Sequence, residues 1–244
     1  MKLWQRAMLS AFLGLAIASQ GITSEYPGEE THYTFSAASR DGIGKHYLGR
    51  EISNIMGHRG AAWLERRMRS SEELPDQVVQ AMNLREDAIV ADIGAGTGYF
   101  TLRISPLVPS GRVYAVDIQP EMLEVIRKRT EHRPLQNIVQ VLGKPNDPML
   151  PKGVLDAVLL VDAYHEFAYP LEMMRGIVRS LRQGGRVFLV EYRGEDPRVP
   201  IKPLHKMTQR QAIREMQAGG LRWVETRDFL PTQHFMVFEK PAET

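Results

Sequence analysis

The sequence predicts an α/β protein with a doubly wound, seven-stranded and mostly parallel sheet whose last strand is antiparallel. From residue 89 onward, short runs of apolar and β-branched residues alternate with segments of helical pattern. Such alternation is typical of a parallel sheet covered on both faces. Only a short connection containing Pro231 separates the last two apolar runs. It predicts a hairpin, and hence an antiparallel final strand.

The elements are expected in a fixed order along the chain. Strands are predicted at residues 89–93, 112–117, 138–142, 155–162, 186–191, 223–230 and 235–239. Helices are predicted at 100–105, 120–131, 171–181 and 209–218, preceded by helical stretches at 61–69 and 74–82. Residues 25–60 lack a sustained period and are rich in glycine, polar and aromatic residues, so irregular chain is expected there. Such a segment often serves as a lid.

The composition is that of an ordinary globular protein. The chain has 244 residues, 43% of them hydrophobic and 25% charged, enough to bury a core without disulfides. It contains no cysteine, which excludes disulfide frameworks, thiolate metal sites and cysteine nucleophiles. Two of the 31 basic residues, Lys2 and Arg6, lie in residues 1–24, which contain no acidic residue. The rest of the chain therefore has 29 basic and 29 acidic residues and no net charge. This balance gives no electrostatic case for binding nucleic acid.

Residues 1–24 have the pattern of a targeting segment. Lys2 and Arg6 precede an apolar run at 7–18, and Ala16-Ile17-Ala18 has small residues at the spacing of a cleavage site. We expect a signal peptide or signal anchor, and therefore an exported, periplasmic or membrane-anchored protein. The run is short for a spanning helix; an amphipathic terminal helix, or a misassigned start and a cytoplasmic protein, are the alternatives. The expected organisation is 1–24 targeting segment, 25–74 N-terminal extension or lid, and 75–244 main domain.

A glycine-rich turn follows the first predicted strand of the main domain. Residues 88–100 read A-I-V-A-D-I-G-A-G-T-G-Y-F, a buried strand running into a helix through a turn whose free N–H groups suit a ligand. The dinucleotide fingerprint G-x-G-x-x-G would need glycine at Tyr99. A purely structural turn is the alternative.

Asp117 ends the second predicted strand, about two dozen residues after Gly94. In a doubly wound sheet this position presents a carboxylate to paired ribose hydroxyls. The alternative is that Asp117 caps the helix beginning at Pro120. Both roles are compatible.

Four segments together resemble the class I S-adenosylmethionine-dependent methyltransferases, which have a Rossmann-like fold. They are D-I-G-A-G-T-G, V-D-I-Q-P-E-M, L-V-D-A-Y-H-E-F and L-R-Q-G-G-R-V-F-L-V-E, and the resemblance spans roughly residues 75–240. It implies S-adenosyl-L-methionine as cofactor, with Asp117 on the ribose. It also implies contacts to the methionine part and the adenine from Asp92, Gly94, Gly96, Thr97, Gly98, Ile118 and Met122.

The chain departs from the family after the third predicted strand. The family often has an acidic residue there that reaches the adenine amino group, within a Gly-Asp-Ala pattern. Here Gly143 is followed by Lys-Pro-Asn146-Asp147. We expect Asn146, Asp147 or the backbone to make this contact.

Methyl transfer from a sulfonium needs mainly proximity and alignment, because the cofactor carries the activation. A base helps if the acceptor is a hydroxyl, phenol or acidic carbon, and it should lie at the end of the fourth strand. His165 is the candidate general base, with Glu166 holding the imidazole and Asp162 touching the cofactor or orienting the site. The alternative is that His165 and Glu166 only cap and pack.

Other positions carry weaker predictions. Tyr192 and His205 are guesses for the acceptor pocket, and Trp63 with His58 could form a lid. No two histidines stand at helical or zinc-site spacing, so no metal site is predicted.

The acceptor is expected to be a small molecule or a lipid. Without cysteine the chain does not resemble arsenite methyltransferases, and without Asn-Pro-Pro-Tyr or Asp-Pro-Pro-Tyr it does not resemble amino-methyltransferases of DNA bases. Two other function classes stay open: a non-catalytic S-adenosylmethionine-binding module, and an NAD-dependent oxidoreductase, which Tyr99 disfavours. Export would also separate the enzyme from its intracellular cofactor.

Overall fold

The computed structural model describes residues 32–132 and 135–242. The predicted targeting segment at 1–24 and the first residues of the N-terminal extension therefore lie outside the described residues. Among the helices of the described ranges, none is long and apolar enough to cross a membrane.

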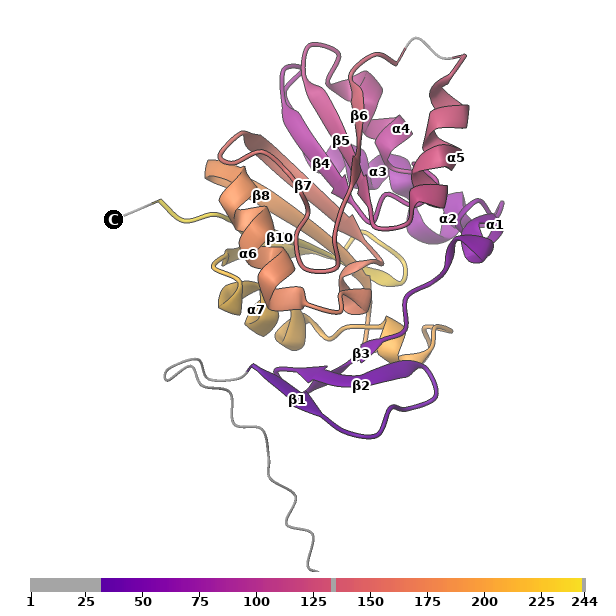
Figure 1. Ribbon diagram of the computed structural model, residues 1–244, viewed down its shortest axis with the longest axis vertical. Helices are drawn as coiled ribbons and strands as arrows, with labels where there is room; N and C mark the ends of the chain where they lie inside the picture. Colours follow the sequence, from indigo (N-terminus) through magenta and orange to yellow (C-terminus); the bar gives the residue numbers. More distant parts are fainter. Residues whose placement is uncertain (1–31, 133–134, 243–244) are drawn as a thin grey trace, which may run out of the picture. The chain divides into compact units, whose positions relative to one another are not determined.

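A seven-stranded mixed sheet forms the centre of the domain (Figure 1). Its order is β6-β5-β4-β7-β8-β10-β9, with parallel pairing from β6 to β8 and antiparallel pairing of β10 to both neighbours. The strands are β4 Ile89–Ile93, β5 Arg112–Asp117, β6 Ile138–Leu142, β7 Leu155–Val161, β8 Leu181–Tyr192, β9 Arg222–Arg227 and β10 Gln233–Glu239. The predicted fold class is confirmed, including the antiparallel last strand.

Helices cover both faces of this sheet (Figure 1). They are α3 Pro75–Ala81, α4 Thr101–Ile104, α5 Pro120–Thr130, α6 Pro170–Ser180 and α7 Gln209–Ala218. One face buries Ala91 and Leu160 against α6 and α7, and the other buries Val90 and Leu159 against α3 and α4. Neighbouring residues of one strand point to opposite faces, so the strands read as continuous apolar runs.

Local sequence signals set the ends of these helices. Pro75, Pro120 and Pro170 stand at the first helical positions, where a missing N–H costs nothing and the fixed φ suits a helix. Thr208 caps α7, because its hydroxyl accepts a hydrogen bond from Gln211 N at 3.2 Å.

The sequence predicted irregular chain in the N-terminal extension. The extension instead forms a small antiparallel sheet. Its strands are β1 Tyr33–Phe35, β2 Gly42–Tyr47 and β3 Arg50–Ser53. Leu48 and Gly49 connect β2 to β3 with φ angles of 46° and 87°, the pair of positive angles that a tight two-residue hairpin requires. Leucine is unusual at such an angle, so the turn escaped detection.

The segment between this small sheet and the main domain is also broken more often than predicted. The helical stretch expected at 61–69 divides into α1 Ala61–Leu64 and α2 Arg69–Glu73. Leu74, with φ of 45°, then separates α2 from α3. The strand expected at 223–230 ends at Arg227.

A buried ion pair fixes the small sheet to the main domain. Arg50 of β3 donates two hydrogen bonds to Glu215 of α7, Nε to Oε1 at 2.7 Å and Nη2 to Oε2 at 2.8 Å. The Glu215 side chain is fully buried. Arg50 Nη1 also donates to the carbonyl of His165 at 3.1 Å. The extension is therefore held against the turn that carries the candidate base.

Candidate active site

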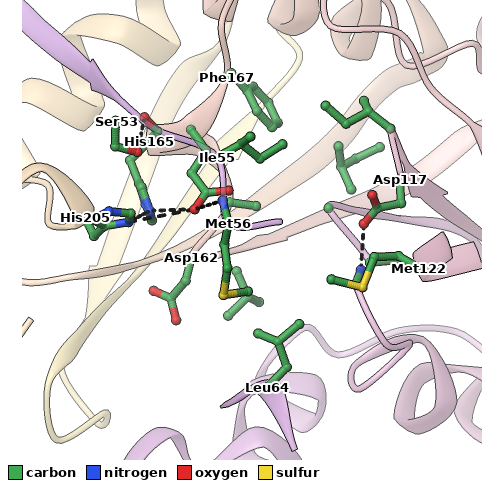
Figure 2. A pocket seen from close by; sticks show the side chains of 18 of the residues that line it. Ser53, Ile55, Met56, Leu64, Asp117, Met122, Asp162, His165, Phe167 and His205 are labelled. Carbon is green, nitrogen blue, oxygen red and sulfur yellow. Dashed lines mark hydrogen bonds and ion pairs between the residues drawn. The ribbon is translucent and has the colours of Figure 1, made fainter. Parts of the chain in front are cut away.

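A cavity of about 650 Å³ opens at the carboxyl ends of β4, β5, β7 and β8, where doubly wound sheets bind ligands. Figure 2 shows the side chains that converge on it from the small sheet and from the strand ends. The glycine turn, the end of β5 and the turn after β7 form one part of its wall. The segment after β3 adds Ser53, Ile55 and Met56, which the sequence did not identify because it predicted no strand there.

The glycine turn lies close to its neighbours in space. Gly94 and Gly96 line the cavity with φ of 74° and 54°, angles that favour glycine. A Cβ at Gly94 would lie 2.6 Å from the Cβ of Ala163. Thr97 also lines the cavity, and its hydroxyl donates to Glu65 at 2.5 Å.

Gly98 has a different role from the one predicted. It does not line the cavity. Its φ is 79°, and a Cβ there would lie 3.0 Å from Cγ1 of Ile126 on α5. Gly98 thus allows close packing of the turn on α5.

Asp117 lies at the end of β5 with both carboxylate oxygens oriented by backbone groups. Oδ2 accepts from Gly96 N and Oδ1 from Gln119 N, each at 2.9 Å. Burial is the main cause that raises the pKa of Asp117, and these N–H groups oppose it. The first bond ties the carboxylate to the glycine turn and the second ties it to the residue preceding α5. These two bonds hold the carboxylate at the cavity wall between the glycine turn and the start of α5.

The predicted adenine side is only partly brought together. Ile118 and Met122 line the cavity. Asn146 and Asp147 do not; instead, Asp147 accepts from Met149 N at 2.8 Å and pairs with Arg179 at 3.4 Å. Gly143 and Pro145 form the wall at this point. Among the alternatives drawn from the sequence, the backbone of this segment is therefore the one that lies at the cavity wall.

Two buried carboxyls, those of Asp92 and Asp162, line the cavity. Asp92 accepts from the Thr101 hydroxyl at 2.6 Å, and burial raises the pKa of Asp92 to about 6. Asp162 Oδ2 accepts from Gln233 Nε2 at 2.7 Å, while its Oδ1 is shielded from solvent without any partner. Burial also raises the pKa of Asp162 well above its usual value. An unpartnered oxygen on a cavity wall suits an amino donor of a bound ligand.

The sequence predicted that Glu166 orients His165. In the structure the imidazole contacts Glu191 instead. Its Nδ1 lies 2.6 Å from Glu191 Oε2 at the end of β8, and both side chains are almost fully buried. Glu166 Oε1 is 3.9 Å from Nε2 and accepts from Met56 N at 3.1 Å. Glu191 is a glutamate inside a buried apolar strand, and that contrast with its neighbours is the sequence signal that could have identified it.

The packing alternative for His165 also has support. The His165 carbonyl accepts from Arg50 Nη1 and from the Ser53 hydroxyl at 3.3 Å. The backbone of this turn thus holds the small sheet, while the imidazole Nε2 points toward the cavity and lies 3.2 Å from Nδ1 of His205.

Three of the four residues with weaker predictions lie at the cavity wall. Tyr192 and His205 both line the cavity, as does Trp63, which is 43% exposed. His58 does not line it; its N–H donates to Gln119 at 2.7 Å. The Tyr192 hydroxyl donates to buried Glu73 at 3.1 Å.

Comparison with known proteins agrees with this site. A family model described as a methyltransferase domain matches residues 91–189. The chain is 31% identical over 153 residues to a methyltransferase-like protein of Schizosaccharomyces pombe, covering 62% of this chain and 57% of that protein. It is 26% identical over 164 residues to a demethylmenaquinone methyltransferase of Geobacillus, covering 67% and 63%. The chain thus spans less than two thirds of the length of these relatives.

The same fold is found in solved structures. A methyltransferase structure from Aquifex aeolicus superposes with a TM-score of 0.72 at 19% identity, covering 76% of this chain and all of that one. The resemblance to the class I S-adenosylmethionine-dependent methyltransferases is therefore confirmed in sequence and in fold. S-adenosylmethionine is the cofactor that goes with this class, and the unpartnered Asp162 oxygen and the close glycine turn fit it.

Proposed function

We propose that this protein transfers a methyl group from S-adenosylmethionine to a small, largely apolar acceptor with an acidic proton. The observation that carries the proposal is one continuous cavity whose wall includes both the glycine turn with Asp117 and the imidazole of His165. When bound, the cofactor supplies an activated methyl group. The chain's own task is then to hold the cofactor, align the acceptor and receive its proton.

The residues divide between two ends of the cavity. Asp117 is oriented to accept from ribose hydroxyls, and Oδ1 of Asp162 is available to accept from the amino group of the methionine part. Ile118 and Met122 offer apolar surface to the adenine.

The cavity wall also carries many apolar side chains. They include Ile43, Ile55, Met56, Trp63, Phe167 and Ile201. Such a lining favours a lipophilic or aromatic acceptor, and the similarity to a demethylmenaquinone methyltransferase supports that choice. With Nδ1 committed to Glu191, Nε2 of His165 is the nitrogen that can take a proton.

Calorimetric titration tests the proposal. The chain is titrated in parallel with S-adenosylmethionine, S-adenosylhomocysteine and NAD. We expect micromolar binding of the two sulfur nucleosides and none of NAD. Silence from a folded sample would contradict the proposal. Binding without turnover across a broad screen of phenols, quinols and hydroxy acids would instead identify a non-catalytic binding module.

The base role of His165 has a kinetic test on an identified acceptor. We expect His165→Ala to lower kcat by about 10²-fold to 10⁴-fold. Glu191→Gln should change the pH profile of kcat with a smaller loss, because it acts through the imidazole. Unchanged turnover of His165→Ala across pH would exclude the base role.

We also propose that residues 1–24 direct the protein out of the cytoplasm or anchor it to a membrane. Their positively charged start and apolar run support this. Cell fractionation of the full chain and of a form lacking residues 1–24 tests it; identical cytoplasmic location of both would contradict it.

A further inference from the structure

Three potential metal ligands meet at the acceptor end of the cavity. His165 and Glu166 belong to the short 3-10 helix Tyr164–Glu166, and His205 ends another, Pro203–His205. His165 Nε2 lies 3.2 Å from His205 Nδ1 and 3.9 Å from Glu166 Oε1. The remaining separation, from His205 Nδ1 to Glu166 Oε1, is 3.7 Å. Figure 2 shows His165 and His205 side by side near Ser53 and Met56.

We propose that His165, Glu166 and His205 bind a divalent transition-metal ion of the zinc type. Zinc lies about 2.0 to 2.2 Å from nitrogen and oxygen ligands, which places the donor atoms of a tetrahedral site about 3.3 Å apart. The three observed separations are close to this value, so small rotations of the side chains complete the site. Two imidazoles and one carboxylate are a donor set for zinc or iron, whereas magnesium and calcium prefer oxygen alone.

The surroundings of the cluster orient its ligands as a metal site requires. Glu191 accepts from His165 Nδ1 at 2.6 Å, the carboxylate–imidazole contact that leaves Nε2 free for a metal. Met56 N donates to Glu166 Oε1 at 3.1 Å and fixes that carboxylate. All three ligand residues line the cavity, so an open coordination position can face the acceptor, as in catalytic zinc sites.

The buried carboxylate of Glu166 also favours a bound cation. The Glu166 side chain is only 14% exposed, and its ion-pair partners among the described residues are the two imidazoles alone. A poorly solvated carboxylate without a strong cation is costly, and a divalent ion offsets that cost. A hydrogen bond from His205 to His165 explains the imidazole pair without a metal, but it does not explain why Glu166 approaches both rings.

The metal would change how the acceptor loses its proton, a consequence that rests on the proposed function. In the metal-bound protein Nε2 of His165 would be a ligand, so this proposal replaces the proton-accepting role given to the imidazole above. A metal-bound hydroxide instead accepts the proton of an acceptor O–H, giving metal-bound water and an acceptor oxyanion. The acceptor class favoured is therefore an oxygen ligand such as a phenol or an enol.

The experiment measures metal binding directly, without activity. The 244-residue chain is prepared without a histidine tag, treated with a chelator, and titrated with Co²⁺ while its visible absorption is recorded. Equilibrium dialysis with Zn²⁺ gives the stoichiometry. We expect one equivalent of each ion and bands typical of a low-coordinate cobalt site.

Variants locate the ion. Glu166→Gln and His205→Ala should each weaken Co²⁺ binding at least tenfold, whereas His46→Ala, a histidine of β2 outside the cluster, should not. Circular dichroism confirms that the variants are folded. If the wild-type chain binds no Co²⁺, or if the ligand variants bind like His46→Ala, the cluster is only a hydrogen-bonded histidine pair and the proposal is overturned.

The two proposals fail in different ways. Calorimetry with S-adenosylmethionine on the metal-free and the Zn²⁺-loaded chain accompanies the titration. Metal binding without cofactor binding would refute the methyltransferase function alone, and cofactor binding without metal binding would refute the metal site alone.

Discussion

Asp117 links the cofactor site to the fold through a single carboxylate. Its two oxygens accept from Gly96 N and Gln119 N, and these bonds fix the orientation in which the remaining lone pairs meet a ligand. Asp117 is only 7% exposed. Few water molecules therefore compete with a ligand hydroxyl for hydrogen bonds to its carboxylate.

The first prediction concerns Asp117→Ala. Hydrogen bonds to a charged group contribute about 1.5–3 kcal/mol, so we expect S-adenosylmethionine to bind about 10-fold to 100-fold more weakly. Asp117→Asn should lose less, because one acceptor oxygen is kept. Calorimetry measures both, with Glu124→Ala on the exposed side of α5 as control. Wild-type affinity in Asp117→Ala would contradict the ribose role.

Asp92 gives a prediction about pH. Burial raises the pKa of Asp92 from 3.8 to about 6, so the folded protein holds this proton more tightly than the unfolded chain. The resulting stability is fully present below pH 3.8 and is lost as the pH rises through 6. Above that pH the chain carries a poorly solvated charge.

Asp92→Asn removes this charge while keeping an acceptor for Thr101. We expect the variant to exceed wild type in free energy of unfolding by about 1–3 kcal/mol at pH 7.5, and to match it near pH 4. Urea unfolding at the two pH values checks this. A difference that does not change with pH would refute the assignment.

At the scale of elements, the turn between β4 and α4 depends on close approach as well as on backbone angle. Gly94 and Gly184 have φ of 74° and 70°. A Cβ at Gly94 would lie 2.6 Å from Ala163, whereas nothing lies within 4 Å of one at Gly184. A side chain at Gly184 would thus meet backbone strain alone, whereas one at Gly94 would meet the same strain and a steric clash with Ala163.

We expect Gly184→Ala to lower the free energy of unfolding by about 1 kcal/mol through strain alone. Gly94→Ala should cost about 1–3 kcal/mol more, because Ala163 must move. Chemical denaturation of both variants measures the difference. Equal losses of unfolding free energy in the two variants would mean that Ala163, in the turn after β7, moves aside without cost.

At the scale of the whole described domain, a buried ion pair between Arg50 and Glu215 is one of the contacts that join the small sheet to the main domain. The Arg50 and Glu215 side chains are 10% and 0% exposed, and removing one partner of such a pair leaves the other charge unpaired. The cavity wall at Ile55 and Met56 directly follows the strand that carries Arg50.

We expect Glu215→Ala to cost about 3–5 kcal/mol of unfolding free energy and to increase hydrogen exchange in β2 and β3. Arg50→Met in the same chain should restore part of the loss, since no charge is then left unpaired. Arg222→Ala, which breaks the exposed pair with Glu239, should cost no more than about 1 kcal/mol. Unchanged exchange in β2 and β3 would show that other contacts hold the small sheet.

The chain of residues 89–239 was predictable because its signals are local. Each strand is a short apolar run, each long helix has its own starting residues, and the glycine turn with Asp117 lies within one strand–helix–strand unit. These patterns act over a few residues, so the sequence by itself determined the order of elements, the doubly wound sheet and the place of the glycine turn and Asp117 at the cavity wall.

The tertiary structure alone decided the acceptor end. Glu191 is 26 residues from His165, and His205 is 40 residues away, so no spacing along the chain indicates that they meet at one imidazole. The small sheet was not predicted because its turn places a leucine, Leu48, at a positive φ. The sequence also did not indicate that Asp147 pairs with Arg179 and accepts from Met149 N, or that neither Asn146 nor Asp147 lines the cavity. Contacts between distant segments follow from packing, which local pattern does not encode.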